Sequence, residues 1–541
     1  MIDSFSVFWD KVGCRKRYWI PVLFFTISSF GFSIFNRTIS IDDLASELYN
    51  GSSHTMIGGG RWGAELITKL VAIPRISPAS DRLLATFFLV LAGILLASLL
   101  YSICRDYQDG ENVEKYTVLS CCLITYPIIG EIWEYTGANY MSTGGMLLSI
   151  VVCYYLLGRK NARLIDVLLT GFVMSIPMSS YESGAAFYVT LVCAVLFYKY
   201  CIWGDRSRRI KYWKKAVFLA LPVFVALGFR WLIGAILRWA LNVPKRVVGG
   251  AAVIWGKDTI PNILRKFMFG TILNYGVNGL VYLPITIFLI AVFFLIGYII
   301  YISISQKSIM VAVGGLLLIL SVFLLGLIQG DYMAYRTAIP LSALTSFSFF
   351  CLAELFEERR RKLQRIVIVL VMYLVWIQSA FLNSELSLNN QRSENEMRIM
   401  NSIAQRILTV DTKKPVVFVG EYNMSEYFRV AKKDYTGKLS GKMYQRALEM
   451  FKKRYGDYYY TFFHLTEFPD SNINSAINWS INVDGMMEKY FSYLGYDIHV
   501  KDRSSDPEAV IRAQKIVEEQ QMHSYDVMET DGFIIATLQL N

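Results

Sequence analysis

Residues 18–35 read "YWIPVLFFTISSFGFSIF", a run of eighteen residues without a charged side chain. A helix of this length rises roughly 27 Å, which nearly matches the ~30 Å hydrocarbon core of a bilayer. The basic stretch "KVGCRKR" precedes the run, no small-residue cleavage site follows it, and many more apolar runs come after it. This pattern favours a retained membrane span over a removed signal peptide.

The rest of the chain repeats the pattern. Its 541 residues are 54% hydrophobic and 18% charged, and the mean hydropathy of +0.38 is too high for a soluble enzyme of this length. The sequence therefore predicts a polytopic α-helical membrane protein with about eleven spans. The expected spans are 18–36, 83–104, 116–130, 139–157, 164–180, 184–203, 216–237, 280–303, 308–328, 337–355 and 366–383.

Basic loops predict the orientation of these spans. The loops at 158–163, 199–215 and 357–365 carry three, seven and five Lys or Arg residues, and they alternate along the chain with loops of other composition. Because cytoplasmic loops are enriched in Lys and Arg, we expect a multi-pass protein of the cytoplasmic membrane with a cytoplasmic N-terminus. The net charge of +11 then lies mostly beside anionic lipid, so nucleic acid is a poor explanation for it.

The composition changes near residue 384, where apolar density falls. We expect a transmembrane domain at 1–383 and a small extracytoplasmic α/β domain at 384–541. Helical patterns "NEMRIMNSIAQRIL" and "PEAVIRAQKIVEEQ" alternate there with four apolar runs that are typical of strands. These runs are "PVVFVG", "YYYTFFHL", "YDIHV" and "FIIATLQL". The domain contains no glycine-rich phosphate loop and no catalytic set that we recognise.

Cysteine and histidine give no sign of a metal site or a disulfide framework. The eight cysteines fall in spans or on their cytoplasmic side, and the four histidines are scattered without metal-ligand spacing. We therefore predict no cofactor, and the question of a divalent metal stays open.

Two adjacent acids follow the first span, in "RTISIDDLASELYNG" at residues 37–51. One explanation is structural: Ser40 and Asp43 have the spacing of a helix start, where acids suit the helix dipole. The other is catalytic: Asp42 or Asp43 is a general base at the membrane surface. Adjacent helical residues point roughly 100° apart, so one of the two would catalyse while the other caps.

The same loop continues with "GGGRWG" at residues 58–63. Glycines allow a ligand to approach the backbone closely, Arg61 offers forked donors for phosphate oxygens, and Trp62 offers a flat face to a sugar ring. An interfacial tryptophan beside a snorkelling arginine is the structural alternative.

Other polar side chains cluster at expected external span ends, where charged groups are costly and often functional. These candidates are Glu131, Glu134, Tyr181, Glu182, Asp331, Tyr335 and Arg336. The loop at 239–279 is also basic for an external segment. Either it departs from the charge rule or it lies along anionic headgroups and holds a phosphate-bearing lipid.

An acidic pair in the first external loop, a following "GRW", about eleven spans, a late "YR" turn and "KPVVFVG" before a C-terminal domain form a recognisable set. The chain resembles the bacterial Gtr-type glucosyltransferases of the GT-C class, which modify O-antigen or other surface polysaccharide and thereby convert serotype. The resemblance implies an undecaprenyl-phosphate glucose donor and a glycan acceptor. It also implies a first-loop carboxylate as base, here Asp42 or Asp43, and Arg61 and Arg336 as phosphate ligands.

A lipid-linked sugar flippase or a polysaccharide polymerase is the alternative class, since both also have many spans. A transporter is expected to show inverted repeats and ionisable residues near the midplane. This chain concentrates its acids and arginines at span ends and adds a sizeable C-terminal domain, which favours glycosyl transfer.

Overall fold

The computed structural model describes most of the chain, and the cluster of helices and the C-terminal residues form two compact units. The first unit comprises 1–35, 53–133 and 137–384; the second comprises 36–52, 134–136 and 385–541. The described residues are 2–36, 38, 54–70, 78–104, 112–133, 138–159, 163–202, 206–245, 255–271, 283–330, 337–356, 361–410, 414–422, 476–503 and 505–540.

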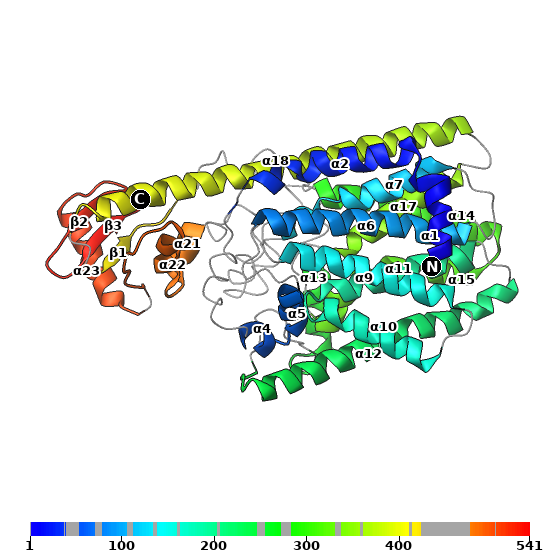
Figure 1. The fold of residues 1–541 in the computed structure, drawn as a ribbon, viewed down its shortest axis with the longest axis horizontal. Coiled ribbons are helices and arrows are strands. Elements are labelled where there is room, and N and C mark those ends of the chain that lie inside the picture. The colour runs from blue at the N-terminus through cyan, green and yellow to red at the C-terminus, as the bar shows by residue number, and fades with distance from the viewer. Residues whose placement is uncertain are drawn as a thin grey trace. The chain divides into compact units, whose positions relative to one another are not determined.

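Helices build the first unit (Figure 1). In chain order they are α1 (Ile2–Phe8), the π-helical turn η1 (Trp9–Gly13), α2 (Lys16–Phe35), α4 (His54–Gly58), α5 (Trp62–Leu70), α6 (Pro78–Cys104), α7 (Val113–Ile124), α8 (Ile128–Trp133), α9 (Ala138–Gly158), α10 (Leu164–Met178), α11 (Ser183–Leu196), η2 (Phe197–Ile202), α12 (Arg206–Ala240), α13 (Ile260–Thr271), α14 (Leu283–Ser305), α15 (Ile309–Ser321), α16 (Leu324–Gln329) and α17 (Pro340–Leu355). The 47-residue helix α18 (Arg361–Ile407) begins in this unit and ends in the second.

Seven described helices are long and apolar enough to cross a membrane: α2, α6, α9, α11 with η2, α12, α14 and α18. Three shorter apolar helices, α10, α15 and α17, coincide with three more of the eleven expected spans. The remaining one, expected at 116–130, is divided into α7 and α8 by a break at Thr125–Pro127. The length and apolar composition of these helices are those expected of a helical membrane protein.

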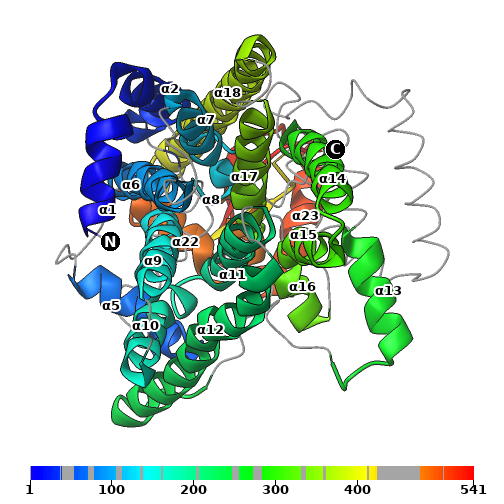
Figure 2. The ribbon, with the colours of Figure 1, turned by 90° about the vertical axis from the view of Figure 1, so that its right-hand side faces the viewer.

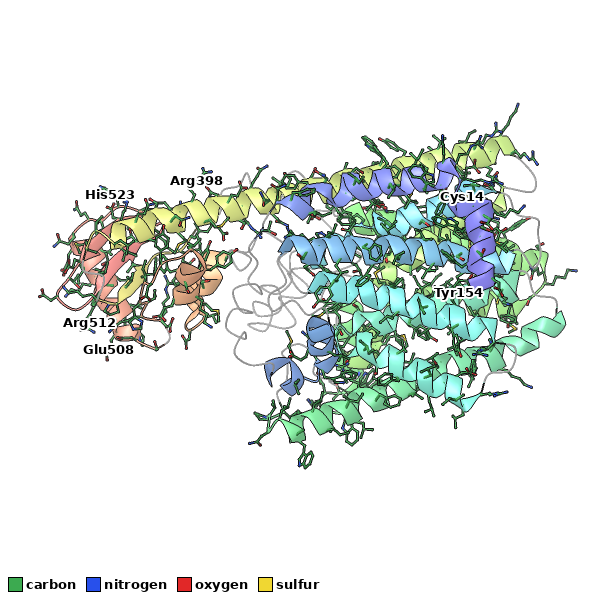
Figure 3. The ribbon with its side chains drawn as sticks, viewed as in Figure 1. Cys14, Tyr154, Arg398, Glu508, Arg512 and His523 are labelled. Carbon is green, nitrogen blue, oxygen red and sulfur yellow. The ribbon has the colours of Figure 1, made fainter. Side chains whose placement is uncertain are left out.

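The broken helix α7 lies inside the bundle, where it packs against α2, α6 and α17 (Figure 2). Asn112 begins it by accepting a hydrogen bond from the Glu114 backbone N–H at 3.2 Å. Its residues from Lys115 to Ile124 are buried on every side, which explains why its hydrophobic pattern has no polar face. Tyr154, labelled in Figure 3, is buried nearby between α9 and α6, where its hydroxyl contacts Ser98 Oγ at 3.0 Å.

The bundle has two ends, which we name from their helix termini. At the loop end, α2 finishes at Phe35 while α6 and α9 begin; at the opposite end, α6 finishes at Cys104 and α7 begins. Helix α10 runs back from the opposite end, so the turn at 179–182 lies at the loop end. Helix α12 also runs from the opposite end to the loop end, so its last turns lie at the loop end. Among the described helices, at least six therefore have an end at the loop end: α2, α6, α9, α10, α11 and α12.

The second unit contains a three-stranded sheet in the order β1-β3-β2, from β1 (Val416–Val419), β2 (Val527–Glu529) and β3 (Ile534–Thr537). Strand β1 is parallel to β3, and β2 is antiparallel to it. Side chains alternate along β1: Val417 and Val419 pack with α23 (Pro507–Glu519), whereas Val416 and Phe418 pack with the end of α18 and with α21 (Ala476–Asn482) and α22 (Met486–Tyr493). Glu508 and Arg512 lie on the outer side of α23 (Figure 3).

Two of the four expected strands, "PVVFVG" and "FIIATLQL", contain β1 and β3. The run "YDIHV" differs, because only Val500 pairs, in a single bridge with Val416. Strand β2 was not expected, since three residues are too few for an alternating pattern to show. The run "YYYTFFHL" lies outside the described residues.

Candidate functional site

A carboxylate and two guanidinium groups meet at the loop end. Glu182 follows the turn between α10 and α11, and its Oε1 lies 2.7 Å from Nη2 of Arg230 on α12. Its Oε2 lies 3.6 Å from Nη2 of Arg61, which precedes α5. The side chains are partly exposed, by 30% for Glu182, 23% for Arg230 and 30% for Arg61. We call this group the Arg61–Glu182–Arg230 cluster.

Close packing of α5 against the end of α10 sets the position of Arg61. A Cβ on Gly63 would lie 2.2 Å from Ser179 Oγ and 2.3 Å from the Ile176 carbonyl oxygen, so only glycine fits there. Gly60 serves the preceding turn instead: its φ is 76°, and a Cβ added there would meet no atom within 4 Å. The glycines of "GGGRWG" thus include one that packs and one that turns.

Trp62 fastens the same segment to α12. Its side chain is buried, and its Nε1 donates a hydrogen bond to the Arg230 carbonyl oxygen at 3.3 Å. One turn along α12, a Cβ on Gly234 would stand 3.7 Å from Cδ1 of Trp62 and 3.2 Å from Nη1 of Arg238. The indole therefore lies where α12 lacks side-chain bulk, and it holds the two arginine-bearing segments together.

Hydrogen bonds also fix the turn that carries Tyr181 and Glu182. Ser179 Oγ donates to the Ser175 carbonyl oxygen at 2.6 Å, and the Tyr181 N–H donates to the Pro177 carbonyl oxygen at 2.8 Å. Burial raises the pKa of the Glu182 carboxyl, but the attraction of Arg230 and then Arg61 outweighs it and leaves that pKa lowered. Glu182 is therefore ionised at neutral pH, and the cluster carries one net positive charge.

Among the described residues, each guanidinium group uses one terminal nitrogen in the contact with Glu182. A guanidinium group has five N–H donors in a planar fork, which match the oxygens of phosphate. The cluster thus offers further donors and an excess positive charge at a partly exposed position. It can bind an anion.

A second polar group ties helix ends together at the loop end. Asp81 accepts hydrogen bonds from Nδ2 of Asn139 at 2.6 Å and from the Tyr140 N–H at 3.3 Å, at the start of α9. Arg82 donates to the Ser33 carbonyl oxygen at 2.7 Å, in the last turn of α2. Both charged side chains are buried. They fix the described ends of α2, α6 and α9 at the loop end.

Arg230, Asp81 and Arg82 were not singled out from the sequence, although each had a signal. Arg230 is a lone charge in the apolar run "ALGFRWLIG", and intramembrane charges are candidates by default. Asp81 and Arg82 form an adjacent charged pair at the start of a span. Their pattern was indistinguishable from an ordinary helix start.

The structure brings together Arg61, Trp62, Tyr181 and Glu182 of the expected site. Glu131 belongs to α8, but its side chain is outside the described part of the chain. Six other candidates lie wholly outside it: Asp42, Asp43, Glu134, Asp331, Tyr335 and Arg336. Within the described ranges, no group of three His, Cys, Asp or Glu side chains is placed to hold a metal ion.

Comparison with known proteins identifies the family. A model of the family described as glucosyl transferase GtrII matches residues 31–353, a stretch that contains the whole Arg61–Glu182–Arg230 cluster and more than half of the chain. No curated protein and no solved structure matched. The chain therefore belongs to the GtrII family of glucosyl transferases.

Proposed function

We propose that the protein transfers glucose from a polyprenyl-phosphate donor to a surface polysaccharide or a lipid-linked glycan. The observation that carries the proposal is the Arg61–Glu182–Arg230 cluster at the loop end. Its net positive charge and forked donors suit the phosphate of a lipid-linked sugar. Family membership supplies the glucosyl transfer.

The charge of the leaving group fits this site. In a lipid monophosphate sugar the phosphate is a diester with one negative charge, and it gains a second as the bond to the sugar breaks. Preorganised arginines that face the phosphate stabilise this growing charge in the transition state. A leaving group with so little charge does not require a divalent cation to neutralise it. Arg336 is a further proposed phosphate ligand.

The reaction is a single displacement that inverts the anomeric carbon. An acceptor hydroxyl attacks that carbon from the face opposite the phosphate, its proton passes to Asp42 or Asp43, and the carbon–oxygen bond to the phosphate breaks. The electron pair of that bond leaves with the lipid phosphate. A positioned general base contributes typically 10²–10⁴-fold to such a rate. Tyr181 borders the phosphate ligands and is proposed to contact the donor, whereas the buried Trp62 positions the segments that carry Arg61 and Arg230.

The site is proposed to face the outside of the cytoplasmic membrane. The basic segments 158–163, 199–215 and 357–365 adjoin or include the ends of α9, η2, α12 and α18 that lie at the opposite end of the bundle, which supports a cytoplasmic location for that end. A cysteine introduced at Asn472 should then react with an impermeant reagent in intact spheroplasts. Labelling only after permeabilisation would contradict the topology.

Transfer itself is tested with purified protein and radiolabelled polyprenyl-phosphate glucose. We expect label to move to an acceptor glycan, with release of free lipid phosphate. The Arg61→Gln and Arg230→Gln variants should lose donor binding. Movement of intact donor across the bilayer without cleavage would indicate a flippase instead. A screen of several polyprenyl-phosphate sugars would then identify the hexose.

A further inference from the structure

Glu182 presents a question that phosphate binding alone does not answer. Its carboxylate stands between the two guanidinium groups, 2.7 Å from Nη2 of Arg230 and 3.6 Å from Nη2 of Arg61. A carboxylate in this place repels a bound phosphate. Without it the cluster would carry two positive charges instead of one, and it would bind anions more tightly.

The two lipids that occupy the proposed site differ by one charge. The donor is a phosphodiester with one negative charge, whereas the product is a phosphate monoester. Monoesters lose their second proton near pH 6, so the product carries two negative charges above neutral pH. Because Coulomb energy is proportional to ligand charge, every added positive charge at the site favours the product over the donor.

We infer that Glu182 is a counter-charge that lowers the affinity of Arg61 and Arg230 for the dianionic lipid phosphate, so that this product dissociates after glucose transfer. The inference rests on the proposed function. Glu182 acts through the guanidinium groups and not on the reacting atoms. It is therefore a residue that sets the balance between donor and product, and not a catalytic one.

The surroundings fix Glu182 in this role. Each carboxylate oxygen has its own guanidinium partner, and the preceding turn is held by hydrogen bonds from Ser179 and Tyr181. Along the sequence of α5 and α12 the further charged residues nearest to Arg61 and Arg230 are Glu65 and Arg238, which are opposite in sign. The carboxylate of Glu182 thus decides the net charge next to a ligand.

The Glu182→Gln variant tests the inference, since it keeps the shape and removes the charge. Full-length protein in nanodiscs is titrated at pH 8 with two probes, a short-chain isoprenyl phosphoglucose and the matching isoprenyl phosphate. Relative to the wild type, the variant should bind both probes more tightly. Because isoprenyl phosphate carries twice the charge, its gain in affinity should be the square of the gain for the phosphoglucose. Removing a partly exposed charge that lies beyond the guanidinium groups from the phosphate should raise the affinity about threefold for the phosphoglucose and about ninefold for the phosphate.

Control variants separate the possible outcomes. Glu114→Gln removes the same charge at the opposite end of the bundle and should change the two affinities much less. Glu182→Ser, which leaves room for water, carries the same expectation as Glu182→Gln and serves if that variant does not yield folded protein. An equal change for both probes, or none, would overturn the inference. If Arg61→Gln and Arg230→Gln bind both probes as the wild type does, the phosphate site itself is wrong.

Discussion

The first unit has an ion cluster at each end of the bundle, and the two differ in burial and charge balance. At the opposite end, Lys115 Nζ lies 3.3 Å from Glu354 Oε1, with side chains 0% and 6% exposed. Tyr198 donates a hydrogen bond to the same carboxylate oxygen, and the ring of Phe350 lies 5.8 Å from the Lys115 ammonium. Cys104 at the end of α6 also lies 3.8 Å from that oxygen, so α6, α7, η2 and α17 meet there around one Lys–Glu pair.

At the loop end, one carboxylate serves two guanidinium groups, and all three are partly exposed. A matched and buried pair has little left to offer a ligand, and its effect is to hold helices in register. An unmatched and accessible cluster contributes less to stability, because solvent screens it, but it keeps donors and charge for an anion. The difference supports the proposal that the Lys115–Glu354 pair is structural and that the Arg61–Glu182–Arg230 cluster binds the donor phosphate.

The largest expected effect tests whether the chemistry belongs to the loop end. We expect either Asp42→Asn or Asp43→Asn to lower glucose transfer by about 10²–10⁴-fold, because it removes the general base. The other should stay largely active. Both should fold, since Asn caps helices about as well as Asp. Radiolabel transfer and donor binding are measured on each variant; near wild-type rates from both would shift the role of base to Glu131, Glu134 or Glu182.

The next prediction addresses the opposite end. Lys115→Met removes the cation beside the buried Glu354 carboxylate and should destabilise the protein by about 3–5 kcal/mol. Transfer per folded molecule should stay unchanged. The matched control is Lys115→Met combined with Glu354→Met, which removes both charges and should recover most of the stability. Thermal unfolding in detergent measures this; a large loss of turnover in folded Lys115→Met protein would contradict the structural assignment.

The sequence allowed the helices to be predicted because apolar stretches of span length are a local signal. All eleven expected spans overlap described helices, including the one divided at Thr125–Pro127. Pro127 was the local sign of that division, since proline removes a backbone donor and disfavours a continuous helix. The short strand β2 had no such signal, because its three residues, Val527–Glu529, are too few for an alternating pattern to show.

Site residues were predictable one at a time but not as a set. Arg61 and Glu182 were each candidates, yet their contact joins segments 121 residues apart and depends on how α5 packs against α10. Arg230 stands within an apolar stretch of sequence, and that pattern predicts only a membrane span. Gly63 illustrates the same limit, because its need for glycine comes from Ser179 and Ile176 on another helix.

A smaller effect is expected from changing the shape of a cation at constant charge. Arg230→Lys should lower turnover about tenfold, because an ammonium cannot hold two phosphate oxygens in the fork geometry of a guanidinium group. Arg336→Lys carries the same expectation. Unfolding temperatures should change little, in contrast to Lys115→Met. Steady-state transfer at saturating acceptor measures the effect, and wild-type turnover in a Lys variant would remove that arginine from the site.

The smallest expected effect is that of a chelator. The loop-end cluster has an excess of positive charge, which serves the phosphate and repels a divalent cation, so transfer should persist in excess chelator. The expectation follows from the single charge on the donor phosphate, which two or three arginines can stabilise. Transfer is measured before and after chelation and again after adding back Mg²⁺ or Mn²⁺. Complete loss, restored by one ion, would mean that Asp42, Asp43 or Glu182 is a metal ligand. The comparison between the two ends would then change, because the loop end would bind its phosphate through a metal ion as well as through arginines.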